Sequence, residues 1–273
     1  MNAVFWDCHM HSSYSADSDT PMEEMVRKAV SLGLPGICFT EHLDPDYPDT
    51  PEHLDFSLDI PSYRKAFFDL KEKYASRIPL RFGIELGLQP HLGETLSDVV
   101  RQEDFDFVIG SSHVLDHEDP YYPVFFNGKN EKDVYRRYFE SELECLQAFS
   151  DFDVYGHLDY IVRYGPRKNA DFRFDDHAEV LDALLEELIR KDIGLEINTG
   201  GFHYGLGEPN PCSEILSRYH HLGGRIITIG ADAHSPDRIA FAFDKAKDVL
   251  LRCGFREFTV FTRRKPTFYP IIP

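Results

Sequence analysis

The sequence predicts an α/β fold in which parallel strands alternate with helices. Short β-type runs and helical patterns follow one another in seven strand–helix repeats, and one more β-type run ends the chain. This alternation implies parallel strands joined by helical crossovers, in either a barrel or an open sheet. The length of 273 residues is normal for a single α/β barrel, and neither an internal repeat nor a linker divides the chain. We therefore expect one domain over residues 1–273.

Each predicted strand is a short apolar run, and a helical pattern follows each of the first seven. The strands are predicted over residues 3–9, 36–42, 81–87, 105–113, 152–159, 194–201, 224–234 and 257–265. The helices are predicted over residues 21–33, 61–76, 94–103, 130–149, 175–191, 210–222 and 235–254. Pro21 suits the start of the first helix and Gly33 suits its end. Residues 42–61 are rich in Pro and Asp and are expected to form a long loop, of a kind that often covers a binding site.

The composition argues against several partners and locations. The chain has 29 basic and 47 acidic residues, and its net charge of −18 repels the phosphates of a nucleic-acid polymer. No segment reaches the roughly 18 continuous apolar residues of a membrane span. The N-terminal residues are too polar for a signal peptide. The five cysteines form no CxxC pair, which favours a reduced, cytoplasmic protein.

Polar side chains follow the predicted strands at their C-terminal ends. These ends carry His9 and His11, Glu41 and His42, Glu85, His113, His157, Asn198, and Asp232 with His234. Residues two apart on a strand share a face, so the first two histidines can point to one ligand, as can the last pair. Active sites of α/β barrels lie at this end of the strands. We therefore expect the functional site there.

Nine of these polar residues are candidate metal ligands. They are His9, His11, Asp17, His42, Glu85, His113, His157, Asp232 and His234. Imidazole and carboxylate ligands suit Zn, Fe or Mn. One catalytic metal needs about three protein ligands, so this set predicts two or three divalent ions with a bridging carboxylate. The alternative is that the histidines are hydrogen-bonded structural residues and that Asp17 is a turn residue or a helix cap.

The motifs around these residues resemble those of the polymerase-and-histidinol-phosphatase (PHP) superfamily. They read HMHSSYSAD, TEH, GIELG, SSH, GHLDY and GADAH, in that order and over most of the chain. The segments EHLDPDYP, GLQPHL, INTGG and GLGEPNP are similar to those of the monofunctional histidinol-phosphatases. The resemblance implies a distorted seven-stranded, TIM-like β/α barrel with phosphatase activity.

The resemblance also implies a trinuclear metal centre. The first ion would be held by His9, His11, Glu85 and Asp232. The second would share Glu85 and be held also by His113 and His157. The third would be held by Asp17, His42 and His234. The family often has a histidine where this chain has Asp17, and a carboxylate there is a competent ligand.

Two phosphate-binding arginines are implied as well. Arg163, in the segment GHLDYIVRYG, matches one of them. His203, in the segment GGFHYG, stands where the other is expected. A protonated His203 would supply a positive charge near neutral pH, although without the fork of an arginine. The alternative for Arg163 is a surface ion pair.

The predicted reaction is metal-assisted hydrolysis of a small phosphomonoester, releasing inorganic phosphate, with L-histidinol phosphate as the favoured substrate in histidine biosynthesis. The metals would provide hydroxide near neutral pH, Arg163 would stabilise the developing charge, and Asp17 or a water would protonate the leaving group. Asp44, in the acidic loop after His42, is predicted to pair with the cationic end of the substrate, unless this loop only faces water. The alternatives are a nucleotide or oligonucleotide phosphoesterase, a protein-tyrosine phosphatase and an inactive metal-binding domain.

Overall fold

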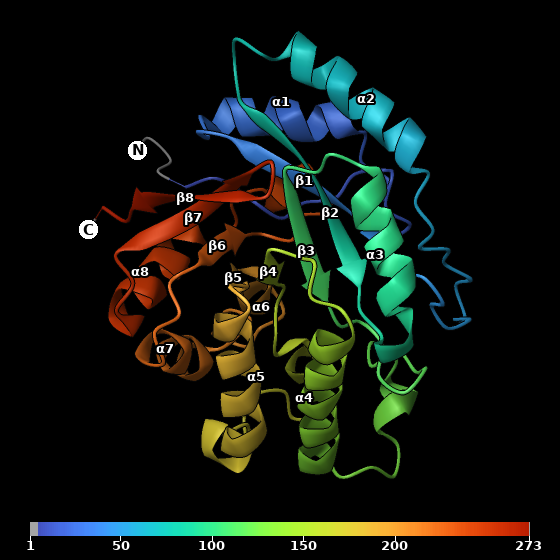
Figure 1. The fold of residues 1–273 in the computed structure, drawn as a ribbon, viewed down its shortest axis with the longest axis vertical. Coiled ribbons are helices and arrows are strands. Elements are labelled where there is room, and N and C mark those ends of the chain that lie inside the picture. The colour runs from blue at the N-terminus through green and yellow to red at the C-terminus, as the bar shows by residue number, and fades with distance from the viewer. Residues whose placement is uncertain (1–4, 273) are drawn as a thin grey trace.

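The computed structural model describes residues 5–272 and contains a curled parallel sheet (Figure 1). Six strands pair in chain order, and every neighbouring pair is parallel. They are β1 (Ile37–Leu43), β2 (Leu80–Gly87), β3 (Phe107–Ser111), β4 (Val154–Tyr155), β5 (Gly194–Asn198) and β6 (Ile227–Gly230). Parallel neighbours require a crossover between consecutive strands, and the helices form these crossovers.

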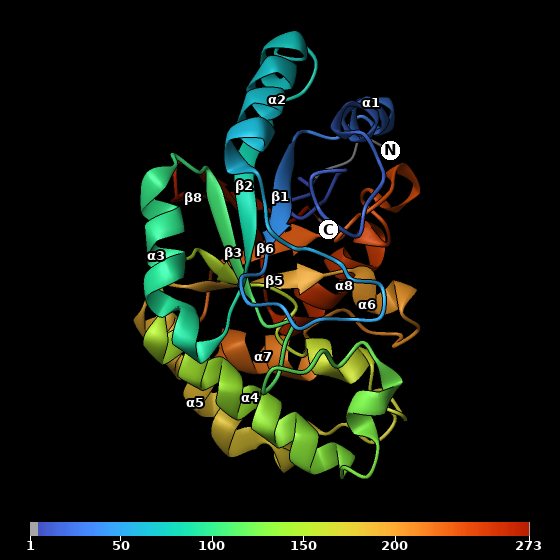
Figure 2. The ribbon, with the colours of Figure 1, turned by 90° about the vertical axis from the view of Figure 1, so that its right-hand side faces the viewer.

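The longer helices surround the outer face of the sheet in both ribbon views, whereas the single-turn helix Gly200–His203 directly follows β5 (Figures 1 and 2). The helices are α1 (Met22–Leu32), α2 (Ile60–Lys73), α3 (Gly93–Gln102), α4 (Glu131–Ala148), α5 (Ala178–Arg190), α6 (Gly200–His203), α7 (Ser213–His221) and α8 (Phe243–Cys253). Short 3₁₀ turns are η1 (Pro90–Leu92), η2 (Pro123–Phe126), η3 (Tyr160–Arg163), η4 (Phe174–Asp176) and η5 (Pro236–Arg238). Between residues 5 and 272, no helix combines the length and the apolarity that crossing a membrane requires.

Local signals mark the ends of some of the helices. Gly33 ends α1 in the left-handed conformation, with φ of 69°, and this confirms the predicted stop. Asp59 caps α2 by accepting a hydrogen bond from the Ser62 N–H at 3.1 Å. The helix predicted over 235–254 is wrong in its first part. Ala240 and Ala242 have φ of 54° and 56°, so the chain is not helical there and α8 begins only at Phe243.

The segment before α1 lies between β1 and β6 but is not a regular strand. Residues 3 and 4 of the predicted first strand lie outside the described residues. The remainder forms isolated parallel bridges, which join Asp7 to Ile37 and Met10 to Ala233. The Asp7 carboxylate accepts the Ala231 N–H at 2.9 Å, and this side-chain bond interrupts the ladder to β6. The parallel sheet therefore contains six regular strands, and the predicted count of seven is not observed.

The C-terminal residues form a separate antiparallel hairpin. It consists of β7 (Glu257–Thr262) and β8 (Lys265–Pro270). The last predicted strand corresponds to β7, whereas β8 was not predicted because all its residues are exposed and show no apolar alternation. The turn uses Arg263 and Arg264 with positive φ, a conformation in which glycine and asparagine are the usual signal.

The predicted long loop is present, and α2, which follows it, is fastened to the sheet by one tyrosine. Residues 44–59 contain neither a helix nor a strand. The fully buried Tyr63 of α2 donates its hydroxyl hydrogen towards Gly83 O of β2 at 2.9 Å and Phe39 O of β1 at 3.2 Å. This contact fixes the crossover between the two strands that carry His42 and Glu85.

Replacement of Tyr63 by Phe should lower the free energy of unfolding by about 1 kcal/mol, because a buried hydrogen bond is lost and nothing replaces it. Urea unfolding at equilibrium measures this change. The matched control is Tyr269→Phe, since Tyr269 is 38% exposed and lies on the outer strand β8. Equal stability of the two variants would contradict a fastening role for Tyr63.

Candidate metal centre

The structure brings the nine predicted metal ligands to the C-terminal end of the parallel sheet. His42 in β1 is the register partner of Glu85 in β2. The other strands end before their candidate ligands, so that these lie in the loops that follow: His113, His157, Asp232 and His234. His157 and Asp232 have φ of 25° and 57°, and the backbone turns out of the strand direction at both residues. The strands thus hold two ligands in register, and sharp turns present the others.

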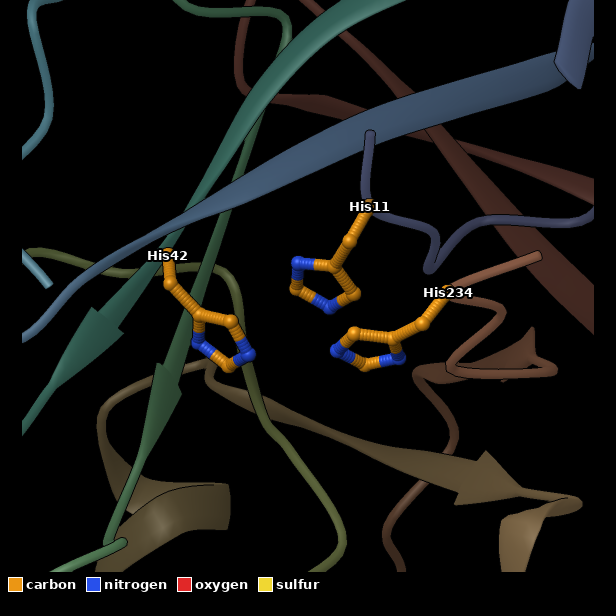
Figure 3. Close-up of side chains that lie close together, drawn as sticks. All are labelled: His11, His42 and His234. Atoms are coloured by element: carbon orange, nitrogen blue, oxygen red, sulfur yellow. The ribbon is translucent and has the colours of Figure 1, made fainter. Parts of the chain in front are cut away.

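The ligand atoms converge in four overlapping groups, and the atoms of each group lie within 4.8 Å of one another. The groups are His11–His42–His234, His9–Glu85–His157, His9–His11–Asp232 and His42–Glu85–His113. Figure 3 shows that the rings of the first group come from three separate segments and approach one another. Asp17 belongs to none of these groups, but its Oδ2 atom lies 3.0 Å from His234 Nε2 and 3.7 Å from His42 Nε2. All nine residues therefore form one continuous cluster.

Glu85 lies at the centre of this cluster and is fully buried. Its Oε2 atom lies 3.0 Å from His9 Nε2 and 3.1 Å from His42 Nδ1. Its Oε1 atom lies 3.0 Å from His157 Nε2 and 3.3 Å from His113 Nε2. Because the two oxygens face different histidines, this one carboxylate can belong to two metal sites.

The donor atoms fit divalent metal ions. The Nε2 atoms of His9 and His11 lie only 3.1 Å apart. Within residues 5–272, the buried Nδ1 atom of His42 forms no hydrogen bond of regular geometry, although Glu85 Oε2 lies 3.1 Å away. A buried polar atom without a hydrogen bond costs about 1–3 kcal/mol, and a cation held between these two atoms would remove that cost. The groups contain imidazoles and carboxylates but no thiolate, a donor set that suits Zn, Fe or Mn.

The ionised carboxylates of the cluster suit metal binding. Burial lowers the pKa of His9, His42, His113 and His234, but the nearby carboxylates outweigh burial and raise each pKa above its usual value, so a metal ion would displace protons from these imidazoles. Burial alone raises the pKa of Glu85, but positive charge on the surrounding histidines, His9 first, outweighs burial and holds this pKa well below its usual value. Burial likewise raises the pKa of Asp232, but the positive charge of His9 outweighs burial and holds this pKa well below its usual value. Burial lowers the pKa of His11 to about 3, and the positive charge of His42 adds to this effect. At neutral pH the carboxylates are ionised and His11 is neutral, as metal ligands must be.

Two buried carboxylates support the ligand imidazoles from behind. Glu196 of β5 accepts a hydrogen bond from His9 Nδ1 at 2.7 Å and another from the His157 backbone N–H at 3.1 Å. Asp44 accepts a hydrogen bond from His113 Nδ1 at 2.6 Å. Such carboxylates fix the tautomer and the orientation of metal-binding histidines. Glu196 was not among the predicted site residues, although a charged residue inside the apolar run of β5 was the available signal.

The position of Asp44 changes the role that the sequence suggests for it. Its side chain is buried, and besides its bond to His113 it lies 3.5 Å from His42 Nδ1. Gly87, at the end of β2, makes this possible, because any Cβ atom at Gly87 would collide with the Asp44 carboxylate. This geometry favours support of the metal ligands over direct contact with the substrate.

Arg163, at the end of η3, is 3% exposed and is held rigidly beside the cluster. Its Nε atom donates to Asn210 Oδ1 at 2.7 Å, and its Nη2 atom donates to Asn198 Oδ1 at 2.9 Å. Its Nη1 atom donates to Asp232 Oδ2 at 3.3 Å. Asn198 was predicted only as a polar strand end. Asn210 was not predicted, because its contact with Arg163 joins segments 47 residues apart. The structure thus fixes a cation next to a predicted metal ligand.

Two clefts open onto the metal centre. The first has a volume of about 250 Å³, and its lining includes Arg163 together with aromatic and acidic side chains: Tyr47, Phe56, Tyr160, Tyr164, Glu52 and Asp119. The second has a volume of about 290 Å³ and shares Asp17, Asp232 and His234 with the first. It adds His203 and Arg238. The metal centre therefore lies where two chemically different clefts meet.

The structure places His203 at the exposed end of α6, in the second cleft. Partial burial lowers its pKa, and the positive charges of Arg238 and Arg163 lower it further. A lowered pKa favours the neutral imidazole and argues against the positive charge considered from the sequence.

Comparisons with known proteins identify the family of this chain. The family model for the PHP domain matches residues 7–200. Histidinol-phosphatase from Lactococcus lactis subsp. lactis is 33% identical over 260 residues, which cover 95% of this chain and 95% of that protein. The probable histidinol-phosphatase from Clostridium acetobutylicum is 31% identical over 256 residues, covering 93% of this chain and 95% of that protein.

Among solved structures, the Lactococcus lactis histidinol phosphate phosphatase complexed with zinc, L-histidinol and phosphate superposes with a TM-score of 0.89. It is 32% identical, and the match covers 97% of this chain and 99% of that chain. A histidinol-phosphatase-like protein from Listeria monocytogenes, at 21% identity and a TM-score of 0.74, shares the fold. The agreement in sequence and in backbone over almost the whole length confirms the resemblance seen in the motifs, and the chain belongs to the histidinol-phosphatase family of PHP-domain proteins.

Proposed function

We propose that this protein is a metal-dependent phosphomonoesterase that hydrolyses L-histidinol phosphate to L-histidinol and inorganic phosphate, as a step of histidine biosynthesis. One observation carries the proposal: five imidazoles lie within 3.4 Å of the buried Glu85 carboxylate. Such a cluster, beside a fixed arginine, suits the binding of metals and of an anionic substrate. The Lactococcus lactis relative, whose structure contains zinc, L-histidinol and phosphate, supports the choice of substrate.

The cluster would hold two or three divalent ions, which we propose to be Zn, Fe or Mn. Grouped by ion, the ligands would be His9, His11, Glu85 and Asp232; then Glu85, His113 and His157; then Asp17, His42 and His234. When bound, such ions supply Lewis acidity towards the phosphate and a hydroxide nucleophile near neutral pH. The position of Glu85 between histidines on both sides supports its bridging role.

Arg163 would orient the phosphoryl group and stabilise the negative charge that develops during the reaction. A guanidinium has five N–H donors. Asn210, Asn198 and Asp232 accept from three of its nitrogen atoms, and the remaining hydrogens are available to an anion at the metal centre, where Asp232 lines both clefts. Because its contacts hold the side chain in place, little reorganisation is needed when charge develops.

Asp17 is better suited to binding a metal than to protonating the leaving group. Burial raises the pKa of Asp17, but the positive charges of His42 and His234 outweigh burial and hold this pKa well below its usual value. An ionised carboxylate has no proton to donate. The charge state of Asp17 therefore supports the ligand role.

The first cleft suits the organic part of the proposed substrate. L-histidinol phosphate carries an aromatic imidazole and an ammonium group. The cleft offers the rings of Tyr160 and Tyr164, and aromatic faces attract cations. It also contains the buried Asp119, which accepts hydrogen bonds from Tyr47 Oη at 2.6 Å and from the Tyr121 N–H at 2.8 Å. An acidic, aromatic cleft favours this substrate over a nucleotide, whose base and sugar carry no cation.

We further propose that segment 7–11 takes the place of the seventh strand in a distorted barrel. The Cys8 N–H donates to Ile229 O of β6 at 2.9 Å, and the Cys38 N–H of β1 donates to Asp7 O at 2.9 Å.

One continuous core supports a single domain over residues 1–273. The five free cysteines are consistent with the cytoplasmic location predicted from the sequence.

Replacement of Glu85 by Gln should lower the metal content and abolish turnover, because a neutral amide cannot bridge two cations as a carboxylate does. Metal content per chain is measured by mass spectrometry, and turnover with L-histidinol phosphate. Glu72→Gln, on the exposed face of α2, is the matched control and should behave as wild type. Full metal content together with wild-type turnover in Glu85→Gln would overturn the bridging role.

Replacement of Arg163 by Ala should cost roughly 2–4 kcal/mol in kcat/KM, because a fixed charged donor to the transition state is removed. The control is Arg167→Ala, since Arg167 is exposed and its ion pairs lie at the surface. Thermal unfolding of both variants separates a loss of chemistry from a loss of folding. A folded Arg163→Ala variant with unchanged kcat/KM would remove Arg163 from the mechanism.

Asp44→Asn and Asp119→Asn should differ in their substrate dependence. Asp44 supports His113, so its replacement should lower kcat/KM about 10- to 100-fold for both L-histidinol phosphate and para-nitrophenyl phosphate. Asp119→Asn should lower kcat/KM about 10-fold for L-histidinol phosphate only, because para-nitrophenyl phosphate lacks an ammonium group. A loss of kcat/KM for L-histidinol phosphate alone in Asp44→Asn would support the substrate contact that the sequence predicts. Equal losses of kcat/KM for both substrates in Asp119→Asn would mean that Asp119 does not bind the cationic end of the substrate.

A further inference from the structure

The second cleft contains a cation that the chemistry proposed above does not use. Arg238, the last residue of η5, is half-buried and lines this cleft together with the candidate metal ligands Asp17, Asp232 and His234. Within residues 5–272 its guanidinium has no hydrogen-bond or ion-pair partner, and it lies over the ring of Phe241 at 5.5 Å. The donors of this guanidinium are therefore free to bind a ligand.

An unpaired arginine beside carboxylates is unusual in a chain with a net charge of −18. Arg218, for comparison, pairs with both oxygens of Asp182 at 2.7 Å. Arg238 instead rests on Phe241, against whose ring His203 packs edge-on at a centroid distance of 6.0 Å. The guanidinium thus contacts an aromatic ring in the wall of the cleft and, within residues 5–272, forms no ion pair with the carboxylates there.

A second guanidinium lies behind the same cleft. Gly200, at the start of α6, lines the cleft, and a Cβ atom added there would lie 3.3 Å from Arg163 Nη2. Arg163 and Arg238 are also the two positive charges that act on His203, which lies in the cleft wall. The lining of the cleft therefore combines Arg238 with three candidate metal ligands, and Arg163 lies behind its Gly200 wall.

We propose that the second cleft is a phosphate-binding site in which Arg238 donates to oxygens of the phosphoryl group or of the inorganic phosphate product. Guanidinium groups match tetrahedral oxyanions because their planar fork can donate two parallel hydrogen bonds. The substrate would then span the metal centre, with its cationic organic part in the first cleft and its phosphate towards the second. This inference rests on the proposed phosphatase function and adds a recognition residue to it.

The test is to measure phosphate binding to the metal-loaded protein by isothermal titration calorimetry, in wild type and in Arg238→Gln. The dissociation constant of inorganic phosphate should rise about 10-fold or more in the variant, because a charge-assisted donor is lost. Metal content per chain is measured in parallel and should not change. The matched control is Arg225→Gln, which removes the same charge from an exposed residue that precedes β6, at the opposite end of that strand from Arg238.

Kinetics with para-nitrophenyl phosphate distinguish the two sources of phosphate. A fall in kcat/KM for Arg238→Gln means that Arg238 binds the phosphoryl group of the substrate. Weaker phosphate binding with unchanged kcat/KM means that it binds the product alone. Unchanged phosphate affinity in metal-replete Arg238→Gln overturns the proposal, as does an equal loss in Arg225→Gln. The choice of L-histidinol phosphate as the substrate is tested separately. It would be wrong if the wild-type protein hydrolysed para-nitrophenyl phosphate but not L-histidinol phosphate.

Discussion

The buried carboxylate of Glu85 is the constraint on which the rest of the site depends. A charge in the middle of an apolar strand is costly unless partners surround it. Here five imidazoles provide them, and they come from β1, from the loops after β3 and β4, and from segment 7–11. The arrangement requires each of these segments to keep its place relative to β2. The close packing of positive and negative groups is also what leaves the carboxylate ionised and ready to bridge cations.

Buried carboxylates behind the candidate metal ligands hold these ligands in place. Glu196 orients His9, Asp44 orients His113, and neither residue has to touch the substrate to affect the chemistry. The irregular geometry of segment 7–11 also positions candidate ligands. The Asp7 carboxylate accepts a hydrogen bond from the Ala231 N–H, and the Asp232 N–H donates to His9 O at 2.9 Å. An interrupted ladder therefore joins two candidate ligands from opposite ends of the chain.

The two clefts beside the metal centre differ in the charged groups that line them. The first cleft combines aromatic rings with acids, and suits a cationic organic group. The second cleft combines Arg238 with the candidate ligands, and Arg163 lies behind its Gly200 wall. Because the chain as a whole is strongly acidic, these two arginines create a local field of opposite sign. A phosphate ester with a positive tail would meet a favourable potential at both ends, and a long polyanion would not.

The sequence by itself determined the alternation of strands and helices, six of the strands in the parallel sheet and the positions of nine candidate ligands. These features follow from local patterns, namely apolar runs, caps and polar residues at strand ends, and the structure brings all nine ligands together as the pattern predicts. Only the tertiary structure decided that segment 7–11 is irregular, that β8 pairs with β7, that Asp44 faces His113, and that Glu196 and Arg238 belong to the site. The physical reason is that each of these features depends on a contact between segments far apart in the chain. His9 and Glu196 are 187 positions apart in the chain, and no local signal indicates that one will accept a hydrogen bond from the other.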